Sequence, residues 1–392
     1  PSKVLIIPHA HAPGDWDTRG LAELVEIYSQ HGSFEWFGRG YLDRGHRIGF
    51  NAAADDHVGH PGNSPSRARS RGGLAGVFAP ELSRESLLGN LKHRRTYGTS
   101  SARIYLENSI AGAAMGDVLK VNDGTGPLRL TGFTAGTGPL AEIAVMMDGN
   151  ETISRRFDSP VDDLKTGKAV LRFRLTRNSE PDNPLTPRTP AADRRYWGRV
   201  VLGSLNPLDH PVGFSDAGQG HTTIESIRPL GVEHYGDYQD QTGRREGAFS
   251  WRVRGDYDGM LLDLMDVDPE QMVSVVIYTS PVADLEYWNT QEQPRLPGEY
   301  WNVDVPRQEV VLRRSVRLGD LVNGPWTVGF DGTAEADLAL VNDKAPWYSE
   351  FSFDLSQEQA ILKGESRYVY VRVRQLDDET AWSSPIFLER EE

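Results

Sequence analysis

The nine residues from Ala54 to Gly62, Ala-Asp-Asp-His-Val-Gly-His-Pro-Gly, concentrate side chains that can bind metal ions. They follow the short, mostly small or apolar run 47–54, which predicts a buried strand. Because alternate residues of a strand point the same way, Asp55 and His57 are expected to face one site. A carboxylate and a neutral imidazole together are ligands that Zn, Mn or Fe accepts. The alternative explanation is an Asp-rich turn at the end of a strand.

Two other apolar runs lead to similar residues. The run Val-Leu-Ile-Ile at 4–7 is followed by Pro8 and then by His9 and His11, and the run 24–28 contains Glu26 and leads to His31. Both runs are predicted strands, and a carboxylate inside an apolar strand needs a partner. In parallel α/β barrels the chemistry lies where the strands end. We therefore expect His9, Asp55 and His57 to converge on one metal site.

Four motifs carry a family resemblance: Ile7-Pro8-His9, Val-Glu-Ile-Tyr-Ser-x-His-Gly-x-x-Glu at 25–35, Asp-x-His-x-x-x-Pro-Gly at 55–62, and Arg-Arg-Thr-Tyr-Gly-Thr-Ser at 94–100. In this order and spacing they resemble a bacterial branch, catalogued as DUF3604, of the PHP superfamily of metal-dependent phosphohydrolases. The segment 368–386 is similar to the C-terminal end of that branch. The resemblance implies the C-terminal portion of a PHP-like distorted (β/α) barrel, followed by an antiparallel β-sandwich region.

The resemblance also implies an activity, metal-dependent hydrolysis of ester bonds with phosphoric esters as the suspected class. Two or three divalent ions, Zn, Mn or Fe, would activate water, and Asp55 and His57 would be catalytic as well as metal-binding. Asp55 would bridge the metals or orient the nucleophile. Sulfate or carboxylate esters would use similar ligands, so the phosphate assignment follows from the family alone.

Further residues of the same motifs would support the substrate and the ligands. His11, Glu26, His31 and His60 would lie behind the metal ligands or face the substrate. Arg94 or Arg95, together with Tyr97, would contact an oxyanion of a small anionic ester, because the guanidinium group presents a planar fork of donors.

The strand with a His-x-His pair that opens PHP proteins has no counterpart here, nor do the ligands that follow it. The first hundred residues contain about four strand-helix units, whereas a closed barrel needs about seven or eight. We therefore expect an N-terminal segment of the same protein to be a partner that completes the metal site. The alternative, from a different class, is a β-sandwich binding or structural protein with an incomplete, inactive barrel remnant.

The predicted organisation is an α/β part over 1–102 and a β-rich part over 103–392 with one or two sandwich domains. Helices are predicted over 35–44 and from Ser83 or Arg84 to Arg95. Beyond residue 103, apolar and polar residues alternate between Gly, Asn and Pro turns, which is typical of antiparallel sandwiches. The predicted strands are 103–107, 128–134, 142–147, 169–175, 196–202, 249–253, 260–264, 272–278, 310–314 and 368–373. Tryptophans in or beside these strands are expected to be core residues and not a sugar-binding platform.

Composition narrows the classes of function. The 42 Lys and Arg against 56 Asp and Glu give a net charge of −14, which argues against nucleic acid as a partner. The local basic clusters at 67–71 and 92–95 are candidates for holding an anionic ester; the alternatives are a solvated loop for the first, which is the simpler explanation there, and the end of a helix for the second. No run approaches the length of a membrane-spanning helix.

Cysteine is absent, so a metal must be held by His and carboxylates. The absence of cysteine is compatible with more than one cellular compartment.

Overall fold

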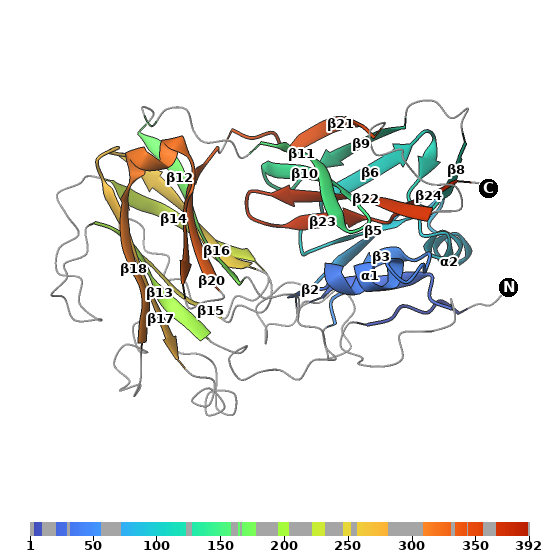
Figure 1. Cartoon of the computed structure of the whole chain (residues 1–392), viewed down its shortest axis with the longest axis horizontal. Coiled ribbons are helices and arrows are strands. Elements are labelled where there is room, and N and C mark those ends of the chain that lie inside the picture. Colours follow the sequence, from blue (N-terminus) through green and yellow to red (C-terminus); the bar gives the residue numbers. More distant parts are fainter. Residues whose placement is uncertain are drawn as a thin grey trace. The chain divides into compact units, whose positions relative to one another are not determined.

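The structure is a computed structural model. The residues that it describes are 4–9, 21–29, 32–55, 72–122, 128–157, 164, 167–177, 195–203, 222–231, 246–251, 257–280, 309–330, 334–342, 344–355 and 366–390. The chain forms two compact units, the first made of residues 1–158 and 344–392 and the second of residues 159–343 (Figure 1). This division differs from the predicted boundary at 102/103, because strands from the end of the chain join the first unit.

An eight-stranded sheet forms the middle of the first unit. Its path is β11-β10-β22-β23-β5-β4, and β24 pairs with both β22 and β8. All neighbours are antiparallel except β24 and β8, which are parallel. The strands are β4 (Leu74–Val77), β5 (Thr96–Thr99), β8 (Val118–Val121), β10 (Leu140–Met147), β11 (Asn150–Arg156), β22 (Ser366–Gln375), β23 (Thr380–Ser383) and β24 (Ile386–Arg390).

A four-stranded antiparallel sheet packs on one face of the eight-stranded sheet. Its order is β21-β9-β6-β7, and its strands are β6 (Tyr105–Ile110), β7 (Ala113–Ala114), β9 (Arg129–Ala135) and β21 (Tyr348–Asp354). Along β6 and β21, exposed or half-buried residues alternate with buried ones, so one face of this sheet is in the core and the other faces solvent. Leu106 and Leu130 from this sheet meet Val145 and Val371 from the larger one in a common apolar core.

The other face of the eight-stranded sheet is also covered. Every residue of β10 is buried, which a two-layer sandwich would not produce. A small sheet of order β2-β1-β3, made of β1 (Leu24–Ser29), β2 (Gly32–Ser33) and β3 (Gly49–Ala52), lies there with helix α1 (Glu35–Leu42). Phe50 of β3 meets the ring of Tyr370 edge-on at 5.1 Å.

The side chain of Glu35, the first residue of α1, joins this layer to the large sheet. Its carboxylate accepts hydrogen bonds from the hydroxyl of Tyr370 and, at 2.9 Å, from the indole N–H of Trp382. Arg372 pairs with the same carboxylate at 3.3 Å. Because the donors come from β22 and β23, the C-terminal strands fix the position of the N-terminal helix.

Several expectations for the first hundred residues are confirmed. β1 and β3 pair in parallel with α1 between them in the chain, which makes a βαβ unit. Helix α2 (Arg84–Lys92) begins after Ser83, whose hydroxyl accepts a hydrogen bond from the backbone N–H of Ser86 at 3.2 Å.

Two expectations for the same region are wrong. Residues 4–9 form no strand, and Val4 is 62% exposed. The segment approaches β1 where the N–H of Glu26 donates to the carbonyl of Pro8 at 3.1 Å. β4 and β5, expected in a parallel α/β layer, pair antiparallel with each other, and β5 pairs antiparallel with β23. Their partner comes from residues 380–383, and a local pattern carries no information about a strand so far along the chain.

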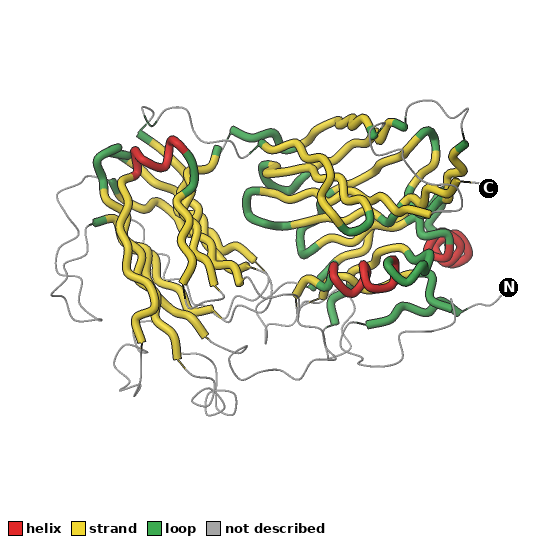
Figure 2. The backbone as a smooth tube through the Cα atoms, in the orientation of Figure 1, coloured by secondary structure: helices red, strands yellow, loops and turns green. Residues whose placement is uncertain are grey.

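The second unit is a β-sandwich by itself (Figure 2). One sheet has the order β14-β16-β12-β20-β19 and the other β15-β13-β17-β18, with every described pair antiparallel. Buried residues of both sheets, such as Phe173 and Val275, form one core, and Trp326 packs against it, as expected. The elements are β12 (Lys168–Arg177), β13 (Arg195–Leu202), β14 (Thr223–Gly231), β15 (Glu246–Trp251), β16 (Tyr257–Met265), β17 (Met272–Ser280), β18 (Glu309–Arg317), the 3-10 helix η3 (Leu318–Asn323), β19 (Trp326–Phe330) and β20 (Ala334–Val341).

The ten strands predicted beyond residue 103 each fall on an observed strand, so a β-rich chain with several antiparallel sheets is confirmed. None of the helices in the described part of the chain is both long and apolar enough to cross a membrane.

Candidate active site

Three predicted site residues meet at the small parallel sheet. Glu26 lies in the middle of β1, every residue of which is buried. Asp55 follows β3 by three residues, and His9 follows Pro8, whose carbonyl is bound to the backbone of Glu26. The site is therefore assembled from three separate segments of the chain.

The imidazole of His9 lies between the two carboxylates. Its Nε2 is 3.0 Å from Oδ2 of Asp55 and 3.4 Å from Oε1 of Glu26. The Glu26 side chain is almost fully buried, that of Asp55 is mostly buried, and His9 is about one third exposed. Both carboxylates therefore approach the same ring nitrogen, Nε2, and the imidazole is partly open to solvent.

The buried environment of Glu26 disfavours the ionised form of its carboxyl group. Burial raises the pKa of its carboxyl from 4.5 to about 7, the nearby His9 lowers this pKa and the negative charge of Asp55 raises it. Oε1 of Glu26 is buried and makes no hydrogen bond within the described residues. A buried carboxylate oxygen of this kind is a site for a proton or a cation.

The backbone at Asp55 has a left-handed conformation, with φ of 52°. Such a conformation is uncommon for residues other than Gly, although Asp tolerates it better than most, and it is found more often at functional sites. It also corrects the expected geometry, because the strand ends at Ala52 and the alternation expected for Asp55 and His57 does not extend to Asp55.

The donor types fit a divalent cation. Two ligands at about 2.1 Å from a metal ion are about 3.0 Å apart in octahedral and about 3.4 Å apart in tetrahedral coordination. The two distances from His9 Nε2, 3.0 and 3.4 Å, lie in this range. However, the described residues contain no group of three or more His, Asp or Glu side chains that could hold a metal ion. The His9–Asp55 and His9–Glu26 pairs thus have the spacing of metal ligands, while the described residues do not supply a complete set of ligands.

The other predicted metal and substrate residues divide into two groups. His57, His11, His31 and His60 lie outside the described residues. Arg94 donates from Nε and Nη2 to the carbonyl of Gly116, at 3.1 and 3.0 Å, and burial lowers its pKa. Arg95 donates to the carbonyl of Met115 and pairs with a carboxylate of the same turn. Both guanidinium groups hold the turn before β8, a role not anticipated from their sequence motif.

Tyr97 lies in β5 next to Arg94 and Arg95 in the motif, but its environment is apolar. Its ring contacts the ring of Phe78 at 5.8 Å between centroids and packs against the sandwich core. Burial raises the pKa of its hydroxyl. The structure does not bring Tyr97 to Glu26 through any contact that it describes.

Three residues near the site were not singled out from sequence. Asn51 lies opposite Glu26 in the parallel register and is buried beside it. Gly72 and Gly73 pack against the segment that leads to Asp55: a Cβ on Gly72 would lie 2.4 Å from the Cα of Ala54, and the N–H of Gly73 bonds the carbonyl of Ala53. In the sequence, the adjacent glycines at the end of the Gly- and Pro-rich stretch could have indicated this close packing.

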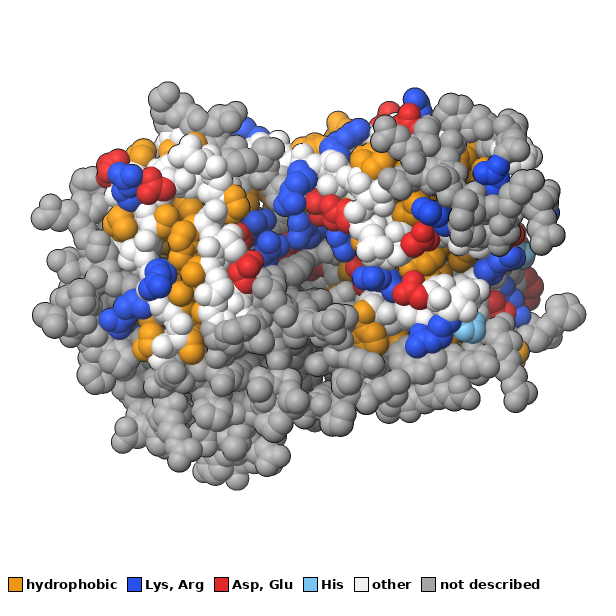
Figure 3. Space-filling view, in the orientation of Figure 1, with side chains coloured by type: hydrophobic (Ala, Val, Ile, Leu, Met, Phe, Trp, Pro, Cys, Tyr) orange, Lys and Arg blue, Asp and Glu red, His pale blue; other side chains and the backbone are white. Residues whose placement is uncertain are grey.

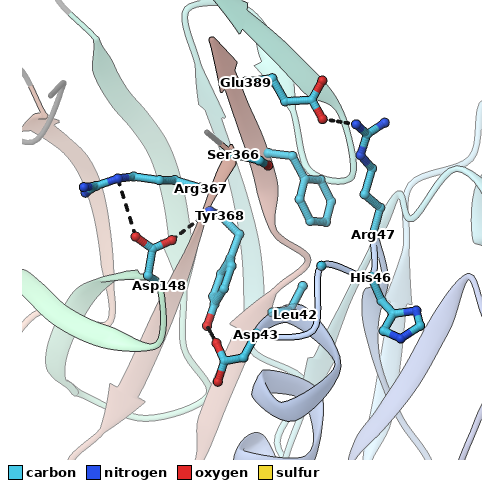
Figure 4. A pocket seen from close by; sticks show the side chains of 11 residues that line it. Leu42, Asp43, His46, Arg47, Asp148, Ser366, Arg367, Tyr368 and Glu389 are labelled. Atoms are coloured by element: carbon cyan, nitrogen blue, oxygen red, sulfur yellow. Dashed lines mark hydrogen bonds and ion pairs between the residues drawn. The ribbon is translucent and has the colours of Figure 1, made fainter. Parts of the chain in front are cut away.

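A separate pocket of about 400 Å³ lies between the end of α1 and β22 (Figure 4). It is lined by Leu42, Asp43, Gly45, His46, Arg47, Asp148, Ser366, Arg367, Tyr368, Phe387 and Glu389. Arg47 is paired with Glu389, and Nε of Arg367 is 3.7 Å from Oδ2 of Asp148. Figure 3 likewise shows acidic and basic side chains side by side on the visible face of this unit. The charges around this pocket are paired with one another, and the pocket is separate from the His9 site.

Comparison with known proteins adds no assignment, since no family model, curated protein or solved structure matches the chain. The geometry of the site therefore carries the functional argument.

Proposed function

We propose that this chain is the C-terminal portion of a PHP-like metal-dependent hydrolase that cleaves ester bonds, with phosphoric esters as the first class to test. The observation that carries the proposal is the meeting of His9, Glu26 and Asp55 from three separate segments. These residues belong to three of the motifs that resemble the PHP branch. The βαβ unit formed by β1, α1 and β3 is the construction expected of a (β/α) barrel, and Asp55 lies beyond the carboxyl end of its second strand.

His9 and Asp55 are the residues that would hold a divalent ion such as Zn, Mn or Fe, with His57 as the third ligand that the sequence motif supplies. The ion would contribute Lewis acidity toward an ester oxygen and toward water. The chain contributes the position of the imidazole, whose Nε2 is 3.0 Å from Asp55 and 3.4 Å from Glu26. Metal ions bind the deprotonated forms of such ligands, so metal affinity should increase with pH. Glu26 would lie beside the ion, because its Oε1 is 3.4 Å from the same Nε2.

The first test is metal binding. The purified protein would be treated with a chelator, dialysed against Zn²⁺ or Mn²⁺, and analysed for bound metal and for hydrolysis of p-nitrophenyl phosphate. We expect His9→Ala and Asp55→Asn to reduce metal affinity at least roughly tenfold, the size of effect seen when a supporting group of a metal site is lost. Hydrolysis should fall in parallel.

The controls are His93→Gln and Glu85→Gln, which change an exposed imidazole and an exposed carboxylate on or beside α2. Both should bind metal as the unchanged protein does. An unchanged protein that takes up no metal, or an Asp55→Asn variant with full affinity, would contradict the proposal and favour a binding or structural role.

A further inference from the structure

A row of aromatic side chains crosses the solvent-facing side of the four-stranded sheet. Tyr348 of β21, Phe133 of β9 and Tyr105 of β6 follow one another, and Phe78 continues the row beyond the sheet. Successive ring centroids are 6.5, 6.0 and 6.0 Å apart. We call these four residues the aromatic row.

Two members of the aromatic row, Tyr348 and Tyr105, are exposed, while Phe133 and Phe78 are half-buried. Tyr348 is 68% exposed and Tyr105 is 38% exposed, and the preceding residue Trp347 is 54% exposed. The core side of the same strands is filled separately, by residues such as Leu106 and Phe351. The two tyrosine rings are thus not required to complete the core, and exposed aromatic side chains gathered on one face of a sheet point to a binding site.

Carboxylates flank the row in register. Phe133 lies opposite Glu107 on one neighbouring strand and opposite Glu350 on the other, so the three side chains form one line across the sheet. The hydroxyl of Tyr105 donates to Oε2 of Glu107 at 2.6 Å. The next line, of Ser109, Thr131 and Ser352, consists of hydroxyl groups. The face therefore alternates ring surfaces with hydrogen-bonding groups.

We propose that this face binds a neutral polysaccharide chain. Hexopyranose rings with equatorial hydroxyls have apolar C–H faces, which stack on the electron-rich faces of aromatic rings, and hydroxyl edges, which donate to carboxylates. The exposed rings of Tyr105 and Tyr348, with the carboxylates of Glu107 and Glu350 on the same face, match both features. The face lies on the opposite side of the large sheet from β1 and β3, so the proposal does not depend on the hydrolase assignment.

The charges argue against other occupants. Nucleic acid and anionic membrane surfaces carry negative charge that Glu107 and Glu350 would repel. A second copy of the chain placed on this face by two-fold symmetry would bring like carboxylates together. A cationic peptide would be attracted, and it is the competing outcome that the experiment must separate.

The test uses isothermal titration of the full chain with cellohexaose, xylohexaose and mannohexaose as neutral probes, with hexalysine as the cationic probe. We expect binding of at least one neutral hexasaccharide and a loss of roughly tenfold or more in affinity for Tyr348→Ala and for Tyr105→Ala, as for aromatic anchors in other interfaces. Glu350→Gln should weaken the same sugar by a smaller factor. The control is Leu82→Ala, which removes a side chain that is 93% exposed elsewhere in the unit.

Because Tyr348 is largely exposed, its replacement should not disturb folding, and equal thermal unfolding of variant and parent verifies this. Failure of every neutral probe to bind would overturn the proposal. So would sugar binding that is unchanged in both tyrosine variants, or binding of hexalysine alone.

Discussion

At the scale of the residue, Glu26 has the most constrained environment of the candidate site. It is 7% exposed in the middle of a buried strand, and an imidazole nitrogen lies 3.4 Å from its Oε1. Burial raises the pKa of the carboxyl more than His9 lowers it, so this pKa is about 7. In the metal-free protein the protonated form of Glu26 is therefore favoured by folding up to neutral pH.

This shift makes stability depend on pH in a predictable direction. The folded pKa of Glu26, about 7, is above its ordinary value of 4.5. The group therefore favours folding most fully below pH 4.5, and that advantage is lost as the pH rises through 7. The full difference corresponds to roughly 3 kcal/mol at most.

Glu26→Gln should accordingly make the metal-free protein more stable than the parent above pH 7, while the two should have similar stability near pH 4.5. Urea unfolding at several pH values measures the difference, and Glu85→Gln, at an exposed position of α2, should follow the parent throughout. A Glu26→Gln variant that is less stable than the parent at pH 8 would show that ionised Glu26 is stabilised by partners and not penalised by burial.

At the scale of the element, Asp55 depends on a close approach between two segments. Gly72 faces the backbone of Ala54, and any side chain at Gly72 would meet it. The approach brings the start of the segment leading to β4 against the end of β3, which limits how far Asp55 can move. The glycine is therefore required by packing, and its effect on the site is indirect.

Gly72→Ala should displace Ala54 and Asp55. We expect a loss of about 1 to 3 kcal/mol in stability, the usual cost of overpacking, together with weaker metal binding. Gly89→Ala is the matched control, because a Cβ there meets nothing within 4 Å and the residue lies inside α2, where alanine is favoured by about 0.5 to 1 kcal/mol. Thermal unfolding and metal analysis of both variants provide the comparison. If Gly72→Ala bound metal like the parent, the close approach would not position Asp55.

At the scale of the whole molecule, the first unit is completed by the last fifty residues of the chain. β22 lies between β10 and β23, and β23 pairs with β5. Glu35 of α1 bonds side chains of both C-terminal strands. The strands of the second unit, in contrast, pair only with one another among the described residues.

A chain that ends at residue 343 should lose the first unit and retain the second. Without β22 and β23 the large sheet is divided, because β10 loses its partner β22 and β5 loses its partner β23. Amide hydrogen exchange of the shortened and full chains would measure this: protection should disappear in β10 and remain in β12 and β16. Persistent protection of β10 in the shortened chain would contradict the prediction.

The sequence by itself determined the local elements. The alternation of apolar and polar residues placed the strands of both sandwiches, and Ser83 placed the start of α2, because these features depend on neighbours within a few residues. It also singled out His9, Glu26 and Asp55 as candidates, since each stands next to or inside an apolar run, and the structure brings these three side chains together. What it did not determine was the partner of each strand, and for this reason the expected parallel layer over 1–100 was wrong at β4 and β5.

Only the tertiary structure decided which side chains meet. Arg94 and Arg95 resemble anion-binding residues in the sequence, yet their guanidinium groups hold the turn at Met115 and Gly116. The aromatic row joins residues 78, 105, 133 and 348, whose proximity arises from sheet pairing between distant segments. Hydrogen-bonded pairing is satisfied equally well by any strand edge of suitable shape, so it is the packing of the whole core, and not a local pattern, that selects the partner.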